Sequence, residues 1–156
     1  RLTSPRLLLF NPKMVNVDLL TKHAAAYKMG RDTFGEYHKQ LFSKHPELAE
    51  YYSAEDIDPD SIPKSQKFQM LGQQELSIFF RLPKAADDER KFRSTLADFK
   101  EVYADIDFPI KEFNKVGDAF LAAMEKNAGG VTAEQKKEWE ALLSQAYTAM
   151  KGYGWY

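Results

Sequence analysis

The sequence of 156 residues contains no cysteine. Disulfide bonds, thiolate catalysis and cysteine-ligated metal sites are therefore excluded within it. The compartment stays open, secreted or cytoplasmic, because a secreted protein can also lack cysteine. The sequence also has no apolar run close to the ~20 residues that a transmembrane helix needs. We therefore expect no membrane span.

An excess of one charge is missing as well. The 22 Lys and Arg residues are balanced by 23 Asp and Glu residues, and the two signs are interleaved. Because no basic stripe stands out, we expect no nucleic-acid or other polyanionic partner. Phosphate-loop, dinucleotide, nucleophile-elbow and zinc-protease motifs are also absent. These absences favour a protein that is not an enzyme.

Helical periodicity is what the sequence does have. Apolar residues recur at spacings of three and four in residues 17–27, 92–103 and 139–150. No strand-like alternation or hairpin dipeptide interrupts them. The pattern predicts an all-α protein of six to eight helices. We expect one domain over residues 17–151, with an N-terminal extension at 1–16 and a C-terminal tail at 152–156.

Helix start signals divide the chain further. Asp32 is expected to cap a helix, and Pro46, Pro63 and Pro109 are each expected to open one. Thr132-x-x-Gln135 reads as a capping box for the last helix. The acidic segment 53–63 is expected to be a loop.

Three segments carry a family resemblance: FSKHPELAEYY (42–52), KFQMLGQQEL (67–76) and DDERKF (87–92). Together with the spacing to Phe108, Phe113 and Trp139, they resemble the nematode branch of the globins. Gly72 matches a glycine that lets two helices cross closely in that family. The resemblance implies a globin-like fold and a likeness to oxygen-binding haem proteins, in which a proximal histidine holds the iron.

The resemblance also assigns the pocket positions. Tyr103 falls at the proximal histidine, Leu71 at the distal glutamine, His38 at the distal tyrosine and Tyr52 at the phenylalanine that wedges the haem. Glu75 falls at an aliphatic position one turn beyond the distal site. The two other candidate haem contacts are Phe99 and Phe113. Nearly every position with a chemical role is therefore changed, and we expect haem to be absent or weakly held.

Glu75 raises a question of its own, because it interrupts an apolar stripe. One stripe of the helix is Phe68, Leu71, Glu75, Ile78 and Leu82, which would bury the carboxylate. The alternative stripe is Phe68, Gly72, Leu76, Phe79 and Pro83, which would leave Glu75 at the surface. If Glu75 points inward, the natural partner for its costly buried charge is His38 on the facing helix.

Three functional hypotheses follow from these assignments. The first is a haem-degenerate globin whose cavity is free of haem or takes an apolar or amphipathic small molecule, and which is not a conventional oxygen carrier. The second is a haem-binding globin that binds oxygen or carries ferric haem, with Tyr103 as the iron ligand and His38 opposite; Lys100 is the nearby cation that could lower the pKa of Tyr103, and weak peroxidase activity is compatible with this arrangement. The third is an interaction protein that uses the fold as a scaffold. Homo-oligomers are compatible with all three.

Overall fold

The computed structural model describes residues 15–156, so the predicted extension at 1–16 lies almost wholly outside the described residues. The regular structure of the described residues is all helical, with no strand, which confirms the all-α prediction. Its elements, in order, are α2 (Val17–Ala25), α3 (Arg31–Lys44), η2 (Pro46–Tyr52), η3 (Pro59–Lys64), α4 (Gln66–Ala85), α5 (Glu89–Asp105), η4 (Ile110–Lys115), α6 (Val116–Asn127) and α7 (Ala133–Gly152), where η marks a 3-10 helix.

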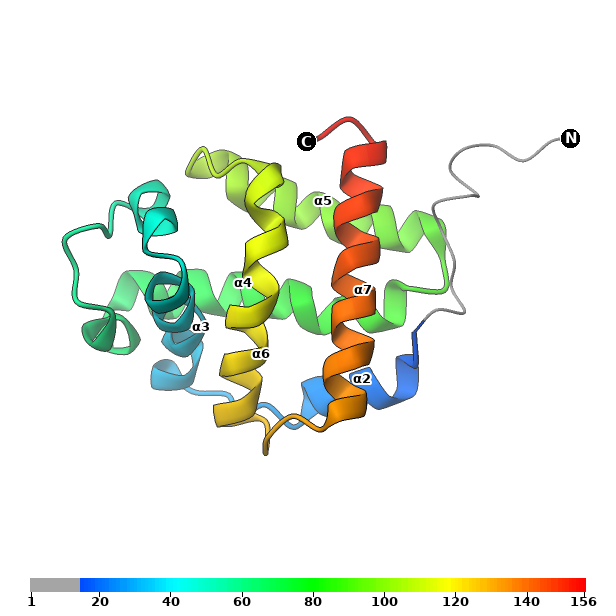
Figure 1. The fold of residues 1–156 in the computed structure, drawn as a ribbon, viewed down its shortest axis with the longest axis horizontal. Coiled ribbons are helices and arrows are strands. Elements are labelled where there is room, and N and C mark those ends of the chain that lie inside the picture. Colours follow the sequence, from blue (N-terminus) through cyan, green and yellow to red (C-terminus); the bar gives the residue numbers. More distant parts are fainter. Residues whose placement is uncertain (1–14) are drawn as a thin grey trace, which may run out of the picture.

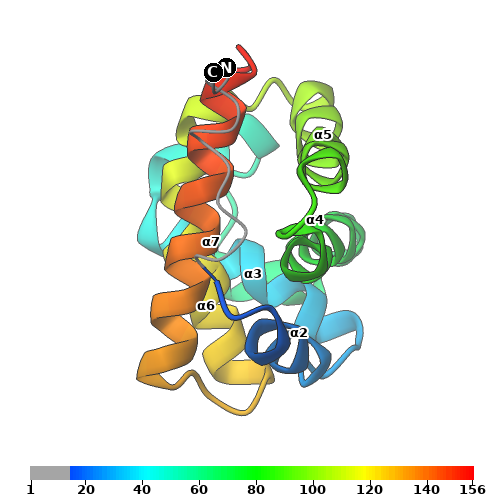
Figure 2. The same ribbon diagram turned by 90° about the vertical axis from the view of Figure 1, so that its right-hand side faces the viewer.

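The helices form two crossed layers (Figures 1 and 2). In one layer α4 and α5 lie against each other, and in the other α6 and α7 run side by side across them. Helix α3 packs on α4, α6 and η3, while α2 closes the end of the bundle against α4 and α7. No helix of the described chain is long and apolar enough to cross a membrane.

Side-chain caps define several helix starts. The side chains of Asn16, Ser65 and Asp88 accept backbone N–H bonds at the starts of α2, α4 and α5. The capping box of Thr132 and Gln135 is confirmed, with both reciprocal hydrogen bonds present. Of these signals only the capping box was predicted from the sequence, and in it two residues three apart act within a single turn.

Some boundaries differ from the prediction. Gly30, not Asp32, is the residue before α3, and Asp32 lies in the first turn, where its charge still favours the helix. The second half of the expected loop 53–63 forms η3, which includes Pro63. Pro63 therefore does not open α4, which begins after Ser65. Pro83 lies inside the last turn of α4, near the helix end, and does not stop the helix.

Helices α3 and α4 cross at very close range. A Cβ atom added to Gly72 would lie 1.9 Å from the carbonyl oxygen of Phe34. Helix α3 also lies close to η3, since a Cβ atom added to Gly35 would lie 2.5 Å from the Cα atom of Pro63. Only glycine permits these approaches. The prediction that Gly72 marks a helix crossing is confirmed, and the crossing places the inner face of α3 directly over α4.

Both candidate stripes of α4 are buried. Glu75, Ile78 and Leu82 of the first stripe are buried, and so are Gly72, Leu76, Phe79 and Pro83 of the second; Phe68 is buried and belongs to both. Helix α4 is covered on several sides by α2, α3, α5 and η3, so a single-sided stripe was the wrong expectation. The surface position considered for Glu75 is therefore wrong.

Candidate functional site

Glu75 is fully buried in the middle of α4, where it belongs to a three-residue hydrogen-bonded array. Nε2 of His38 and Oε2 of Glu75 form a hydrogen bond of 2.9 Å between α3 and α4. The hydroxyl group of Tyr52, at the end of η2, donates to both carboxylate oxygens at 3.1 and 3.2 Å. The predicted pairing of His38 with Glu75 is confirmed. We call these three residues the Glu75 array.

Tyr52 of the array and two neighbouring tyrosines, Tyr37 and Tyr103, resist ionisation. Burial raises the pKa of Tyr52 and Tyr103 well above the ordinary value of 10.0, and the nearby charge of Glu75 raises both further. The pKa of Tyr37 is raised by burial, then by Tyr103 and Glu75. All three side chains are therefore neutral phenols near pH 7, and Tyr52 is a hydrogen-bond donor to the carboxylate.

Tyr103 lies on the inner face of α5, in an aromatic cluster. Its ring stacks on Phe99 at 5.6 Å between centroids, and it lies 4.5 Å from Phe108 and 6.5 Å from Phe113. The expected neighbour Lys100 does not reach it: the ammonium group lies 4.9 Å from the ring centroid of Trp155, at the surface. The expectation that Lys100 lowers the pKa of Tyr103 is therefore wrong.

Phe108 connects this cluster to the Glu75 array. The chain turns sharply after α5, with Asp107 in the left-handed region at φ 55°, and the amide of Phe108 bonds back to the carbonyl of Tyr103 at 2.9 Å. The Phe108 ring thereby lies 5.8 Å from the Tyr52 ring as well. A continuous set of aromatic contacts runs from Tyr103 through Phe108 to Tyr52 and His38.

A second route of ring contacts crosses the same interior. Tyr37 packs edge-on against His38 at 4.8 Å and against Phe79 at 5.4 Å, and Phe79 lies 5.0 Å from Phe99. All of these rings are buried. The rings of Tyr37 on α3, Phe79 on α4 and Phe99 on α5 are thus linked by successive contacts.

Three polar atoms in this interior have no hydrogen-bond partner among the described residues: Nδ1 of His38 and the hydroxyl groups of Tyr37 and Tyr103. The two hydroxyl groups lie close enough to influence each other's ionisation but lack the geometry of a hydrogen bond. Unpaired buried polar atoms are rare in folded proteins. They mark the polar side of the interior, next to the Glu75 array.

The remaining predicted site residues surround this interior. Phe99 and Phe113 are buried and contact each other at 5.2 Å. Leu71 is only partly buried and packs against the core. Tyr37 and Phe108 were not among the candidate site residues: Tyr37 occupies no assigned pocket position, and the position of Phe108 depends on the turn at Asp107.

The other two histidines have separate partners. His23 accepts a hydrogen bond from Nε1 of Trp139 at Nδ1 and contacts the carbonyl oxygen of Gly130 through Nε2, both at 2.9 Å. Since an indole N–H can only donate, Nδ1 is the acceptor and Nε2 carries the proton. Burial lowers the pKa of His23, and the neutral ring is fully satisfied.

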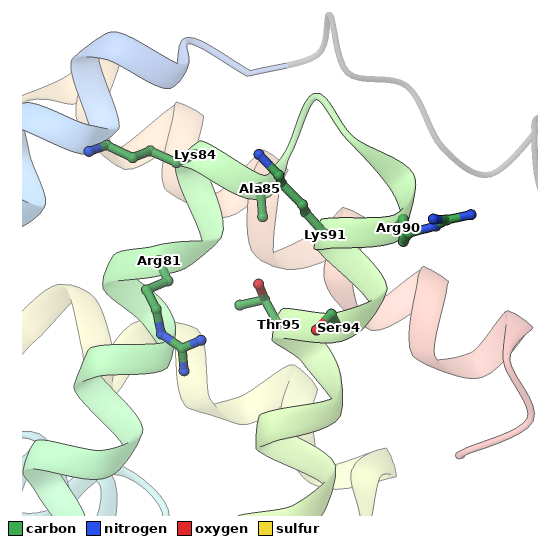
Figure 3. Close-up of a pocket in the computed structure, with 7 residues that line it drawn as sticks. All are labelled: Arg81, Lys84, Ala85, Arg90, Lys91, Ser94 and Thr95. Atoms are coloured by element: carbon green, nitrogen blue, oxygen red, sulfur yellow. The ribbon is translucent and has the colours of Figure 1, made fainter.

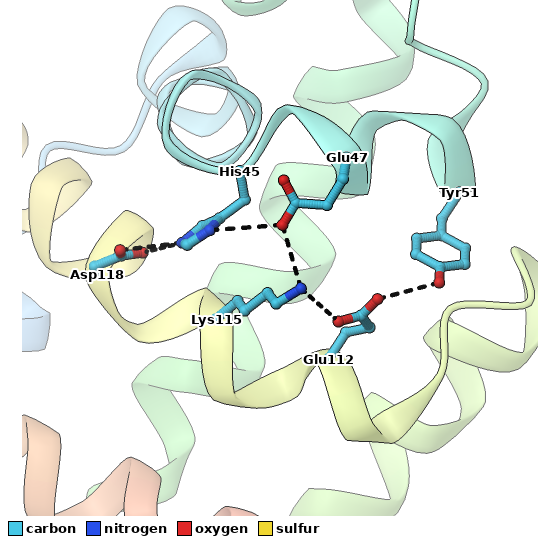
Figure 4. A network of polar contacts seen from close by, with 6 residues as sticks. All are labelled: His45, Glu47, Tyr51, Glu112, Lys115 and Asp118. Atoms are coloured by element: carbon cyan, nitrogen blue, oxygen red, sulfur yellow. Dashed lines mark hydrogen bonds and ion pairs between the residues drawn. The ribbon is translucent and has the colours of Figure 1, made fainter.

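His45 belongs to a surface network that joins η2 to η4 and α6 (Figure 4). Its Nε2 lies 3.0 Å from both oxygens of Asp118, and Lys115 bridges Glu47 and Glu112 at 3.2 and 3.0 Å. The hydroxyl group of Tyr51 donates to Glu112 at 3.1 Å. This network joins η2, which ends at Tyr52, to η4 and to the start of α6.

Comparison with known proteins identifies the fold and the family. The sequence model of the family described as "Globin" matches residues 35–150. The chain belongs to the globin family. It is 32% identical over 111 residues to a myoglobin of Nippostrongylus brasiliensis, covering 69% of this globin and 70% of that protein. This family membership confirms the resemblance found in the sequence.

Other relatives agree. Identity to the globin-like host-protective antigen of Trichostrongylus colubriformis is 27% over 108 residues, covering 69% of this chain and 62% of that protein. Two crystal structures of the Caenorhabditis elegans globin-like protein GLB-1 match the fold, with TM-scores of 0.75 and 0.71 and 20% identity. The matches cover 93% and 97% of this globin and 97% and 98% of those chains. This structural likeness supports the fold alone.

Proposed function

We propose that this globin does not hold haem in the manner of its family and is not a conventional oxygen carrier. The observation that carries the proposal is the position of Phe108, whose ring contacts Tyr52 on one side and Tyr103 on the other. A porphyrin between α4 and α5 would have to displace these interlocked rings. Close packing of buried aromatic side chains makes such a displacement costly.

The chemistry of the lining residues supports the same proposal. Tyr103 stands where a ligating histidine is expected, and the three histidines all have other partners. On the distal side, the Glu75 array places a carboxylate next to the interior. Since haem affinity depends on apolar burial and on an iron bond, both contributions are weakened. The residues present do not fit haem.

A globin with this interior would act in one of two ways. A molecule bound inside would be small and polar, because the groups left to recognise it are Nδ1 of His38 and the hydroxyl groups of Tyr37 and Tyr103. Otherwise the fold is a scaffold and binding takes place at the surface. In both cases the protein is a binding protein rather than an enzyme.

One observation favours a second candidate, a haem protein with Tyr103 as its iron ligand. The hydroxyl group of Tyr103 is buried without a hydrogen-bond partner among the described residues, as an unused ligand would be. Tyrosine ligates haem iron in other proteins. Against this, burial and Glu75 raise the pKa of Tyr103, whereas ligation requires the phenolate. The displacement of Phe108 is needed here too.

A titration of the purified protein with hemin tests the proposal. We expect an absorption spectrum equal to that of free hemin at every ratio. A sharp Soret band that saturates at one equivalent would overturn the proposal. In that event Tyr103→Phe separates the two candidates: loss of the band would identify Tyr103 as the ligand, and an unchanged band would eliminate it.

A further inference from the structure

The corner between the end of α4 and the start of α5 contains a basic pocket of about 440 Å³. Its lining residues are Arg81, Lys84, Ala85, Arg90, Lys91, Ser94 and Thr95. Four of the seven carry a positive charge, two carry a hydroxyl group, and none is a carboxylate. Figure 3 shows Ala85 and Thr95 at the space between the two helices, with Lys91 extending over it and Arg81 beside it, whereas the side chains of Lys84 and Arg90 point outward from the rim.

Helical spacing on both sides builds this pocket. Arg81, Lys84 and Ala85 follow one another at i, i+3 and i+4 on α4, and Lys91, Ser94 and Thr95 do the same on α5. Thr95 is buried at the floor, while the charged side chains are exposed at the rim. Ala85 contributes only a methyl group, which leaves room between the helices.

Most of the positive charge in the pocket is uncompensated. Arg81 pairs with Asp98 at 2.9 Å. Within residues 15–156, Lys84, Arg90 and Lys91 have no carboxylate partner, although the chain as a whole has a net charge of −1. A neighbouring hollow shares Arg90 and Ser94 and adds Arg93, with Glu89 as the only carboxylate among its lining residues.

Two of these cations lie where the helix itself disfavours them. Arg90 and Lys91 are in the first turn of α5, and the helix dipole makes a positive charge there unfavourable by about 0.3–1 kcal/mol. Places where a sequence breaks such a local rule are expected to be functional sites. A bound anion would reverse the sign of the effect, because it interacts favourably with the cations and with the helix N-terminus together.

We propose that this pocket binds a phosphorylated anion, either a small soluble phosphate ester or the phosphorylated headgroup of a lipid. Phosphate oxygens accept charge-assisted hydrogen bonds from lysine and arginine and ordinary ones from serine and threonine. The volume lies within the usual range for small-molecule sites. The proposal is independent of the haem question, since no residue of the pocket belongs to the Glu75 array or its aromatic neighbours.

The sequence alone argued against a polyanionic partner, and the fold explains the difference. The cations come from two short stretches, 81–84 and 90–93, separated by the acidic residues Asp87, Asp88 and Glu89. Asp88 is engaged in capping α5 through the amide of Lys91. The stretches form one surface only after the chain reverses direction between α4 and α5.

Calorimetric titration with soluble inositol trisphosphate at about 0.15 M salt tests the proposal, alongside sedimentation with phosphatidylcholine vesicles that contain or lack phosphatidylinositol bisphosphate. We expect saturable one-site binding in at least one arm. Binding in the soluble arm alone indicates a free ligand, and binding to the phosphoinositide vesicles alone indicates a lipid headgroup. The double variant Lys84→Gln, Lys91→Gln should weaken that binding at least ~10-fold.

The matched control is Lys136→Gln, Lys137→Gln, which removes the same charge from an exposed pair on α7. It should change the affinity less than about twofold, because distant surface charges are screened by salt. Absence of saturable binding in both arms would overturn the proposal. An equal loss of affinity in both double variants would also overturn the proposal. It would mean that binding depends on the net charge of the protein and not on the residues of the pocket.

Discussion

Glu75 is a charged residue whose neighbours make its burial tolerable. Tyr52 and His38 together satisfy both carboxylate oxygens. Removing one member of such an array leaves the polar atoms of the others buried without a hydrogen bond. This costs more stability than replacing every member with an apolar residue. Replacing all members with apolar residues of similar size can be nearly neutral. The array is therefore expected to behave as a unit.

A double-mutant cycle tests this coupling. Glu75→Leu is expected to destabilise the fold by about 3 kcal/mol, because it strands the hydroxyl group of Tyr52 and Nε2 of His38. Tyr52→Phe combined with Glu75→Leu should be less destabilising than the sum of the two, by at least about 1 kcal/mol. Urea denaturation of the four proteins gives the coupling. Additivity within about 0.3 kcal/mol would mean that Tyr52 and Glu75 do not act together.

Gly72 acts at the same scale through its missing side chain. Gly72→Ala places a methyl group against the backbone of Phe34, so α3 and α4 must separate, with an expected loss of about 3 kcal/mol. Gly117→Ala is the matched control in α6, where the new Cβ would meet Leu143 at an ordinary 3.5 Å. The control should be neutral or stabilising by up to about 1 kcal/mol. Thermal unfolding measures both, and similar melting temperatures would refute the close-crossing argument.

At the scale of elements, η2 is held by both of its sides. Its inner side supplies Tyr52 to the Glu75 array, and its outer side joins η4 and α6 through Glu47 and Lys115. These outer pairs are partly exposed, so each contributes little, and salt screens them. The stronger anchoring of η2 is therefore on the buried side.

Lys115→Met tests the outer side. We expect a loss of no more than about 1 kcal/mol at low salt, which disappears at about 1 M NaCl. Lys136→Met removes a charge from a lysine that has no ion pair among the described residues and should have no effect at either salt concentration. A loss from Lys115→Met that persists in high salt would show that the aliphatic stem, rather than the charge, supports the network.

The sequence predicted helix starts best where the signal lies within one helical turn. The capping box at Thr132 and the opening of η2 at Pro46 are local and were found correctly. η3 was missed because its proline and aspartate residues are equally typical of a loop. The burial of both stripes of α4 could not be read from periodicity, since it depends on how many neighbours surround the helix.

The site was predictable to the same extent. The contact of His38 with Glu75 followed from two facing helices and the need of a buried carboxylate for a partner. The packing of Phe108 between Tyr52 and Tyr103 did not follow, because it depends on the left-handed turn at Asp107, where no glycine marks the position.

For the whole molecule, His23 makes stability depend on pH. It links α2 to α7 and to the turn at Gly130 in its neutral form, and its folded pKa is lowered by burial. As the pH falls below the ordinary histidine value of 6.5, the unfolded chain takes up the proton first, so stability decreases until the folded pKa is reached. Urea denaturation between pH 7.5 and pH 5 should show this decrease. His23→Gln should be less stable at pH 7.5 and should show a shallower decrease; an unchanged slope would exclude His23 as its source.

The packing of Phe108 has a consequence for the history of this chain. If the proposed loss of haem holds and an ancestor carried it, replacing Tyr103 with histidine would not by itself recreate that state, because the contact of Phe108 with Tyr52 and the hydrogen bond of Tyr52 to Glu75 would remain. Each reverse step taken alone would break a contact before any new one formed. A lineage that acquired this interior would be separated from its ancestral state by intermediates less stable than either end, and the change would be effectively one-way.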